Sequence, residues 1–282
     1  MNKRVDFMVI GAQKSGTTTL ALQLDQHPEI SFCRIKEPGY FSTTENWAEK
    51  LDEYHALYDW SKPGLRGEGS TMYTFLPEHM GTHQRLHAYN PDLKLIYIMR
   101  NPVDRIISNY THRLVRSTVQ DLPEQAVFAR PEYINRSRYG VQLRPYLELF
   151  GSDQLLLLIF EEYVRAPERT LAQIAAFLDI DAAGFALALA RGQAAHRSVG
   201  EHHLNPVLQS MRTIAPVDRM LNSVPSGMRT QLRKTFGKKL ETRPEFSPEL
   251  RRLLWQFLED DVSAVEGFMQ RPLDIWRQDI PT

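Results

Sequence analysis

A glycine-flanked loop near the start of the chain limits the folds open to this sequence. Residues 11–19 read Gly-Ala-Gln-Lys-Ser-Gly-Thr-Thr-Thr. The apolar run Val5–Ala12 predicts a buried strand before the loop, and Thr17–His27 has the apolar spacing of a helix. A loop between a strand and a helix presents backbone N–H groups and a helix N-terminus to one point, which is how oxyanions are held. Lys14 adds a full positive charge, so the loop is suited to a phosphate or a sulfate.

Buried strands alternate with helices along the chain. Further strands are predicted at Leu93–Met99, Leu155–Phe160 and, more weakly, Gly67–Thr71, and helices at Pro102–Leu114, Glu168–Leu178 and Ser247–Met269. This alternation predicts parallel βαβ units, with ligands at the carboxyl ends of the strands. We expect one domain over residues 1–282 with a P-loop-like, three-layer α/β fold, in which helices flank a central parallel sheet. Its core covers about residues 5–180, and a helical appendage, including His196–Arg243, and a C-terminal helix cover about 181–282.

Composition narrows the possible functions. The 34 basic and 34 acidic side chains cancel, so no nucleic-acid partner is predicted and any anion site must be local. The single cysteine, Cys33, excludes an intrachain disulfide and thiolate-rich metal sites. The apolar run behind the basic N-terminus, Phe7–Ile10, is too short for a signal peptide, and no stretch approaches the roughly 18 residues of a membrane span. We therefore expect a soluble, cytoplasmic protein, of open oligomeric state.

The loop differs from that of a kinase or an ATPase. Those proteins place lysine directly after the second glycine, followed by a hydroxyl that binds Mg²⁺. Here Thr17 follows Gly16, and Lys14 lies two positions before that glycine. The predicted strand at Leu93–Met99 runs into Arg100, where an NTPase carries a metal-binding aspartate. A nucleotide kinase thus stays only as an alternative.

Arg100 opens a second motif that is suited to an anion. Asn101 is a good helix N-cap and Pro102 a good first helical residue. Ser108 then lies about two turns into the helix. A guanidinium and a hydroxyl can therefore converge on a second phosphate.

The two motifs resemble those of sulfotransferases that use 3′-phosphoadenosine 5′-phosphosulfate (PAPS). Residues 14–18 resemble the family's 5′-phosphosulfate loop, and residues 100–108 resemble its 3′-phosphate motif. The heparan-sulfate and related carbohydrate enzymes are the more similar branch, because residues 36–41, Lys-Glu-Pro-Gly-Tyr-Phe, are similar to their acidic residue with an aromatic pair. The resemblance covers Phe7–Leu178, and more loosely Arg243–Trp276.

The resemblance implies transfer of a sulfuryl group from PAPS to a hydroxyl or amine of a carbohydrate or small-molecule acceptor, with release of PAP and without a metal. Its implied cofactor-binding residues are Lys14, Ser15, Gly16, Thr17, Thr18, Arg100, Ser108 and Tyr139. Lys14 would also be catalytic, by neutralising charge on the bridging oxygen, and Glu37 would be the base. The implied acceptor-binding residues are Lys36, Tyr40, Phe41 and Glu68.

The sequence departs from the family in one place and leaves some roles open. Gly69 stands where the carbohydrate enzymes carry a lysine, and Lys36 could compensate. His112 is an alternative base. Basic residues at 229–243 are a candidate cover for the 3′-phosphate, with a solvated helix face as the alternative. His79, His83 and His87 are spaced like metal ligands, but no carboxylate or thiol pattern completes a site. An inactive relative that binds PAP or a glycan remains possible.

Overall fold

The computed structural model describes residues 3–116, 118–190, 202–204, 237–239 and 244–278. Within these ranges, five strands form one parallel sheet in the order β2-β3-β1-β4-β5. The strands are β1 (Phe7–Gly11), β2 (Ile30–Phe32), β3 (Leu65–Gly69), β4 (Lys94–Met99) and β5 (Leu155–Ile159). The predicted parallel sheet is confirmed, and its central strand is the one that precedes the glycine-flanked loop.

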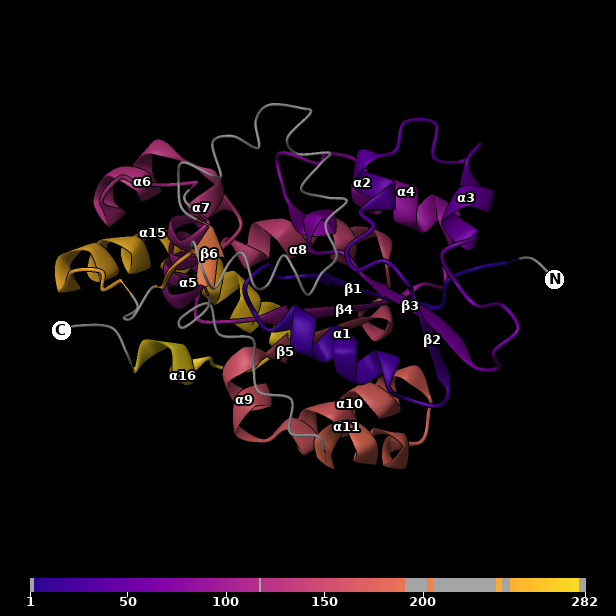
Figure 1. The fold of residues 1–282 in the computed structure, drawn as a ribbon. Helices are drawn as coiled ribbons and strands as arrows, with labels where there is room; N and C mark the ends of the chain where they lie inside the picture. Colours follow the sequence, from indigo (N-terminus) through magenta and orange to yellow (C-terminus); the bar gives the residue numbers. More distant parts are fainter. Residues whose placement is uncertain (1–2, 117, 191–201, 205–236, 240–243, 279–282) are drawn as a thin grey trace.

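Helices cover both faces of this sheet, as Figure 1 shows. The helices are α1 (Thr17–Asp25), α2 (Tyr40–Thr43), α3 (Leu51–His55), α4 (Thr82–Tyr89), α5 (Pro102–Val115), α6 (Pro123–Ala129), α7 (Glu132–Asn135), α8 (Tyr139–Leu149), α9 (Phe160–Arg165), α10 (Pro167–Leu178), α11 (Ala186–Ala190), α15 (Pro248–Met269) and α16 (Asp274–Arg277). Short 3₁₀ turns lie at Thr71–Thr74, Ser152–Gln154 and Ala182–Phe185. In Figure 1, α1, α9, α10 and α11 lie below the sheet, and α2, α3, α4 and α8 lie above it.

The alternation of side chains along β1 explains the three layers. Phe7 and Val9 pack with residues of α1 and α10, whereas Met8 and Ile10 pack with residues of α5, α8 and α15. All five residues of β1 are buried. A strand buried on both faces gains apolar burial on each side, which is why the sequence reads as a continuous apolar run.

The predicted helical appendage is wrong for the parts that the structure describes. His202–Leu204 (β6) and Gly237–Lys239 (β7) pair as antiparallel strands, with Leu204 opposite Gly237. The local polar and proline pattern carried no information about this pairing, which joins segments far apart in the sequence. The basic residues at 229, 233, 234 and 243 lie outside the described residues.

The predicted C-terminal helix is present as α15, but its apolar face differs from the prediction. Leu250, Leu254 and Leu258 are buried, as their helical spacing suggests. Leu253 and Phe257, which were assigned to the same apolar set, are 41% and 58% exposed. The buried face therefore follows one stripe of the helix rather than every leucine on it.

A buried aspartate fixes α15 to the start of α8. Asp261 Oδ2 accepts a hydrogen bond from the Gly140 N–H at 2.9 Å, and its Oδ1 accepts one from the Val141 N–H at 3.0 Å. These N–H groups belong to the first turn of α8, where no intrahelical acceptor exists. Burial raises the pKa of Asp261, which shows the electrostatic cost that its hydrogen bonds must offset.

We expect Asp261→Ala to lower the free energy of unfolding by about 1–2 kcal/mol, because two N–H groups lose their acceptor. Urea denaturation would measure the change. Asp260→Ala is the matched control, because Asp260 is exposed on the same turn of α15, and it should change stability by less than about 0.5 kcal/mol. Equal losses in the two variants would contradict a capping role.

Candidate functional site

The loop between β1 and α1 is built as an anion-binding turn. Gly16 is the N-cap of α1 with a φ of 87°, and no side chain caps the helix. The N–H groups of the first turn therefore remain available to a ligand. Gly16 also tolerates no side chain, because a Cβ atom there would lie 2.8 Å from the Phe160 ring.

Backbone strain is concentrated at two of the residues implied in catalysis. Five described non-glycine residues have a positive φ. Asp179 and Gln270 end helices in the left-handed region, and Asn46 is a residue type that tolerates it. Lys14, with a φ of 72°, and Glu37, with a φ of 55°, have neither explanation. Such conformations cost about 1–2 kcal/mol each and are typical of functional sites.

Lys14 lies within a group of positive charges. Burial is the largest cause that lowers the pKa of Lys14 to about 8, and the positive charges of Arg116, Lys36, Arg105 and Arg100 add to it. A lysine with this environment gains from a nearby anion, because an anion offsets both the repulsion and the lost hydration. The loop is therefore positively charged where its backbone N–H groups converge.

Arg100 lies beside this loop, at the carboxyl end of β4. Its guanidinium stacks over the Phe160 ring, with 5.0 Å between the guanidinium carbon and the ring centroid. Phe160 is also the ring that limits the space at Gly16. Because one ring contacts both motifs, the two predicted anion sites are adjacent rather than on opposite faces of the sheet.

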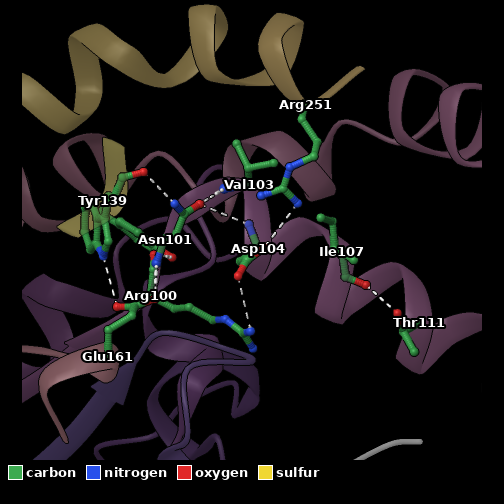
Figure 2. A network of polar contacts seen from close by, with 10 residues as sticks. Arg100, Asn101, Val103, Asp104, Ile107, Thr111, Tyr139, Glu161 and Arg251 are labelled. Atoms are coloured by element: carbon green, nitrogen blue, oxygen red, sulfur yellow. Dashed lines mark hydrogen bonds and ion pairs between the residues drawn. The ribbon is translucent and has the colours of Figure 1, made fainter. Parts of the chain in front are cut away.

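Figure 2 shows the contacts that hold Arg100 and the start of α5. Arg100 Nη2 lies 3.6 Å from Asp104 Oδ2, and Arg251 Nη1 of α15 lies 3.3 Å from Asp104 Oδ1. The Asn101 side chain accepts hydrogen bonds from the N–H groups of Val103 at 3.0 Å and Asp104 at 3.2 Å, which confirms it as the N-cap. Asp104 was not singled out in the sequence, although its position four residues after Arg100 predicts such a contact.

The C-terminal region completes this support. Asn101 Nδ2 donates to the carbonyl of the buried Trp276 at 2.8 Å, across 175 residues of sequence. Glu161 accepts hydrogen bonds from the Asn101 N–H at 2.9 Å and from Trp276 Nε1 at 3.0 Å. Burial raises the pKa of Glu161. No local sequence signal links these three residues, so sequence reasoning missed them.

Ser108 lies on α5, one turn beyond Asp104 and therefore on the same helix face. Ser108 is half-buried. His112, the alternative base, follows after one further turn of α5. Its position groups it with Ser108 rather than with the loop that carries Glu37.

Glu37 and Lys36 approach the phosphate loop from the segment between β2 and α2. Lys36 Nζ donates to Thr18 Oγ1 at 2.7 Å and lies 3.7 Å from Glu37 Oε1. Thr71 Oγ1 donates to Glu37 Oε2 at 3.2 Å. The Glu37 side chain remains 31% exposed, so it can be reached by a proton donor from solvent or from a bound molecule. A carboxylate, an ammonium group and the anion-binding loop thus form one site.

The family described as "Sulfotransferase domain" matches residues 4–264 of this chain. The chain belongs to the sulfotransferase family. It is 25% identical to carbohydrate sulfotransferase 15 of Mus musculus over 243 residues, covering 62% of this chain and 43% of that protein. It is 28% identical to heparan sulfate glucosamine 3-O-sulfotransferase 3A1 of Mus musculus over 192 residues, covering 61% and 45%. The chain thus spans less than half the length of these curated relatives.

Solved sulfotransferase structures share the fold. The crystal structure of a sulfotransferase from Alicyclobacillus acidocaldarius superposes with a TM-score of 0.69 at 25% identity, covering 98% of this chain and all of the other. Mouse sulfotransferase SULT7A1, solved in complex with PAP, gives a TM-score of 0.51 at 18% identity, covering 98% and 88%. The P-loop-like fold predicted from the sequence is confirmed.

The polar atoms left without partners test whether this sulfotransferase site suits PAPS. Ser15 Oγ and Arg100 Nε are two of eight buried side-chain polar atoms that lack a hydrogen-bond partner of good geometry within the described ranges, and Ser15 also lies close to the Tyr139 hydroxyl. A buried donor without a partner costs about 1–3 kcal/mol, and a bound anion is one way to satisfy it. Both belong to the two motifs predicted to bind phosphate, and both can donate to anionic oxygens. The residues present therefore fit the phosphate groups of PAPS.

Three predicted contact residues of the sulfotransferase are corrected by their burial. Tyr139 is fully buried, and its hydroxyl donates to the Arg100 carbonyl at 2.8 Å, so it supports Arg100 instead of facing a ligand. Phe41 is fully buried in the apolar core. Glu68 is fully buried and accepts from the hydroxyls of Tyr54 at 2.8 Å and Tyr58 at 2.9 Å. Phe41 and Glu68 therefore present no surface to an acceptor.

Tyr40 is nearly as deeply placed, with 8% of its surface exposed, and it stacks on Tyr54 with ring centroids 4.6 Å apart. Of the four predicted acceptor residues, Lys36 alone is exposed. Burial raises the pKa of Glu68, as expected for a carboxyl group enclosed by aromatic rings. Tyr40, Phe41 and Glu68 thus belong to the buried layer beneath the site.

The three regularly spaced histidines each contact an aromatic ring. His79 stacks on Phe75, whereas His83 and His87 meet the edges of Tyr146 and Phe150. His79 also lies before α4, which begins at Thr82, so the three do not share one helix. Within the described ranges, histidine, cysteine and acidic side chains form no group of three that could hold a metal ion. In the same ranges, no helix is long and apolar enough to cross a membrane.

We expect Gly16→Ala to lower the free energy of unfolding more than Gly81→Ala does. Both glycines are N-caps with a left-handed φ, 87° and 79°, so both substitutions carry a backbone cost of about 1–2 kcal/mol. The alanine at 16 also collides with Phe160, whereas at 81 the nearest atom is 3.4 Å away, so Gly16→Ala should cost about 1–3 kcal/mol more. Urea denaturation measures both, and equal costs would contradict the close contact with Phe160.

Proposed function

We propose that this chain transfers a sulfuryl group from PAPS to a hydroxyl or amine of an acceptor and releases PAP. The observation that carries the proposal is the adjacency of Lys14 and Arg100. They follow the neighbouring strands β1 and β4, the Phe160 ring contacts both of their motifs, and Arg100 contributes to the low pKa of Lys14. One ligand with two separated anionic groups matches this arrangement, and membership of the sulfotransferase family supports PAPS as that ligand.

The residues divide between the two ends of the nucleotide. Lys14, Ser15, Gly16, Thr17 and Thr18 would hold the 5′-phosphosulfate through backbone N–H groups, hydroxyls and one ammonium. Arg100 and Ser108 would hold the 3′-phosphate. PAPS supplies an activated sulfuryl group, and the ammonium of Lys14 is placed to neutralise the charge that develops on the departing phosphate.

Glu37 is the proposed general base. The acceptor oxygen or nitrogen forms a bond to sulfur while the bond from sulfur to the bridging oxygen breaks, and the electron pair stays on the phosphate of PAP. The acceptor proton passes to Glu37, which returns it to solvent. Thr71 donates to one carboxylate oxygen of Glu37, and the Gly69 carbonyl accepts from the Glu37 N–H at 3.1 Å, so both the side chain and the backbone of the base are held.

A carbohydrate is the acceptor that we propose first. Two of the curated relatives are named for sulfation of a carbohydrate or of heparan sulfate glucosamine. The acceptor contacts themselves reduce to Lys36, since the aromatic residues predicted for this purpose are buried. A small-molecule phenol is the second acceptor class to test. The cytoplasmic location stays a prediction.

We expect PAP to bind with proton uptake. A bound phosphate favours protonated Lys14, whose pKa is about 8 in the free protein, so at pH 8 PAP should take up about half a proton. Binding should therefore weaken as the pH rises above 8, by up to roughly tenfold per unit. Calorimetry in two buffers of different ionisation enthalpy measures the uptake.

Lys14→Met is the control for that experiment and should abolish the uptake near pH 8. ATP, which has no 3′-phosphate for Arg100 and Ser108, should bind at least about tenfold more weakly than PAP. Equal affinity for ATP would contradict the proposed function, as would phosphate transfer from ATP that depends on Mg²⁺.

We expect Glu37→Gln to leave PAP affinity unchanged and to lower turnover by about 10²-fold or more, because glutamine cannot accept the acceptor proton. Turnover is the formation of PAP and of sulfated product from PAPS, with heparan sulfate and 4-nitrophenol as probe acceptors. Glu49→Gln, the same change at an exposed residue between α2 and α3, should have no effect. Full turnover in Glu37→Gln would overturn the base assignment.

A further inference from the structure

Lys36 lies between the proposed phosphosulfate loop and the proposed general base, Glu37. Its ammonium contacts Thr18 Oγ1 in the first turn of α1 at 2.7 Å, and it lies 3.7 Å from the Glu37 carboxylate. The Lys36 side chain is 53% exposed, so its ammonium group can be reached by a bound ligand. Lys36 thus spans the space between the predicted phosphosulfate loop and the predicted base.

The strand beside this space, β3, ends at a residue without a side chain. Gly69 ends β3, next to Val9 of β1. A Cβ atom at Gly69 would lie 3.6 Å from the Phe32 ring and 3.7 Å from Val9 Cβ. Val9 packs with Leu20 and Leu24 of α1, so a side chain at position 69 would start on the α1 side of the sheet. Its neighbour Glu68 is enclosed by tyrosines instead.

The segment that carries Lys36 is tied to β3 at that glycine. The Glu37 N–H donates to the Gly69 carbonyl at 3.1 Å, and the left-handed φ of Glu37 sets the course of the chain there. Gly39 N–H donates to Ser70 Oγ at 3.0 Å, which fixes the segment a second time. Lys36 therefore reaches the α1 side of the sheet from a rigid attachment to the end of β3, where Gly69 offers no side chain.

We propose that Lys36 is a catalytic residue that places a positive charge against the sulfuryl group as it passes from PAPS to the acceptor. The inference rests on the proposed function. Lys14 neutralises the oxygen of the departing phosphate, Glu37 receives the acceptor proton, and Lys36 stabilises the negative charge on the sulfuryl oxygens between them. A fixed charge at such a place lowers the barrier because it is aligned before the reaction begins.

The alternative is a surface ion pair that only orders Glu37. Exposed pairs contribute little, and the separation of 3.7 Å is long for a strong one. The two accounts differ in what a lysine at another position can do. If the charge acts on the sulfuryl group, a lysine introduced at position 69, where there is room for a side chain, can replace Lys36. If Lys36 only orders Glu37, a lysine at position 69 cannot replace it.

The test compares Lys36→Met, Lys36→Arg and the double variant Lys36→Met with Gly69→Lys. PAP affinity is measured by calorimetry, and kcat and KM are measured with PAPS and whichever probe, heparan sulfate or 4-nitrophenol, the unaltered protein sulfates. We expect Lys36→Met to lower kcat by about 10²-fold and PAP affinity by less than about threefold. Lys36→Arg should stay within about tenfold of normal kcat, because it keeps the charge.

The double variant, Lys36→Met with Gly69→Lys, should have a kcat at least about tenfold higher than that of Lys36→Met alone. Lys50→Met, the same change at an exposed lysine outside the site, is the matched control and should be normal. Normal kcat in Lys36→Met would overturn the proposal. A loss confined to KM or to PAP affinity would also overturn it, since the charge would then act in binding alone.

A double variant that binds PAP normally and shows no recovery would overturn the placement of the charge between Thr18 and Glu37. These outcomes are distinct from failure of the proposed function. That failure would appear in the unaltered protein, as an absence of PAP binding or an absence of sulfated product from PAPS.

Discussion

Mutual repulsion among cations shapes the carboxyl edge of this sheet. Lys14 is half-buried near Arg100 and Lys36, and Arg105 lies fully inside the protein on α5. Arg105 is held by the Tyr133 carbonyl at 2.6 Å and by Ser137 Oγ, and within the described ranges no carboxylate forms an ion pair with it. Such a cluster costs stability in the free protein, and the buried apolar layers on both sides of β1 and β4 offset that cost. An anionic ligand relieves the repulsion, so part of the folding energy is stored as affinity for anions.

The position of Arg100 depends on parts of the chain that are distant in sequence. Tyr139 holds its carbonyl, and Phe160 lies under its guanidinium. Asn101 begins α5 and is itself bound by Glu161 and by Trp276 near the C-terminus. The docking of α15 and α16 onto the sheet layer therefore supports the proposed nucleotide site. If the proposed function holds, a substitution in these helices changes PAP binding without touching the ligand, because it shifts the turn that carries Arg100.

The acceptor side is built on a different physical basis. Glu68 accepts hydrogen bonds from Tyr54 and Tyr58. These buried residues form the layer that supports the segment carrying Lys36 and Glu37. The buried layer supports the segment from below. The hydrogen bonds from the N–H groups of Glu37 and Gly39 to Gly69 and Ser70 attach it to the end of β3. The aromatic residues thus act on the acceptor only through the shape of the loop above them. Such rigid support holds the proposed base, Glu37, and the ammonium group of Lys36 in one geometry.

The sequence by itself determined the features that arise from local pattern. Neighbouring residues alone set the local conformation at Gly16, at the Asn101-Pro102 start of α5 and along the apolar runs of β1 and β4. Those patterns indicated the family and the parallel sheet, whereas the adjacency of the two anion motifs follows from the pairing of β1 with β4 and from Phe160. Only the tertiary structure decided which polar and aromatic side chains face outward. Tyr139, Phe41 and Glu68 are buried because elements from elsewhere in the chain pack over them, as α15 does on α8 and as the tyrosines at 54 and 58 do on β3. Burial is set by contacts between distant segments, and a single sequence shows only the residues, not which of them meet.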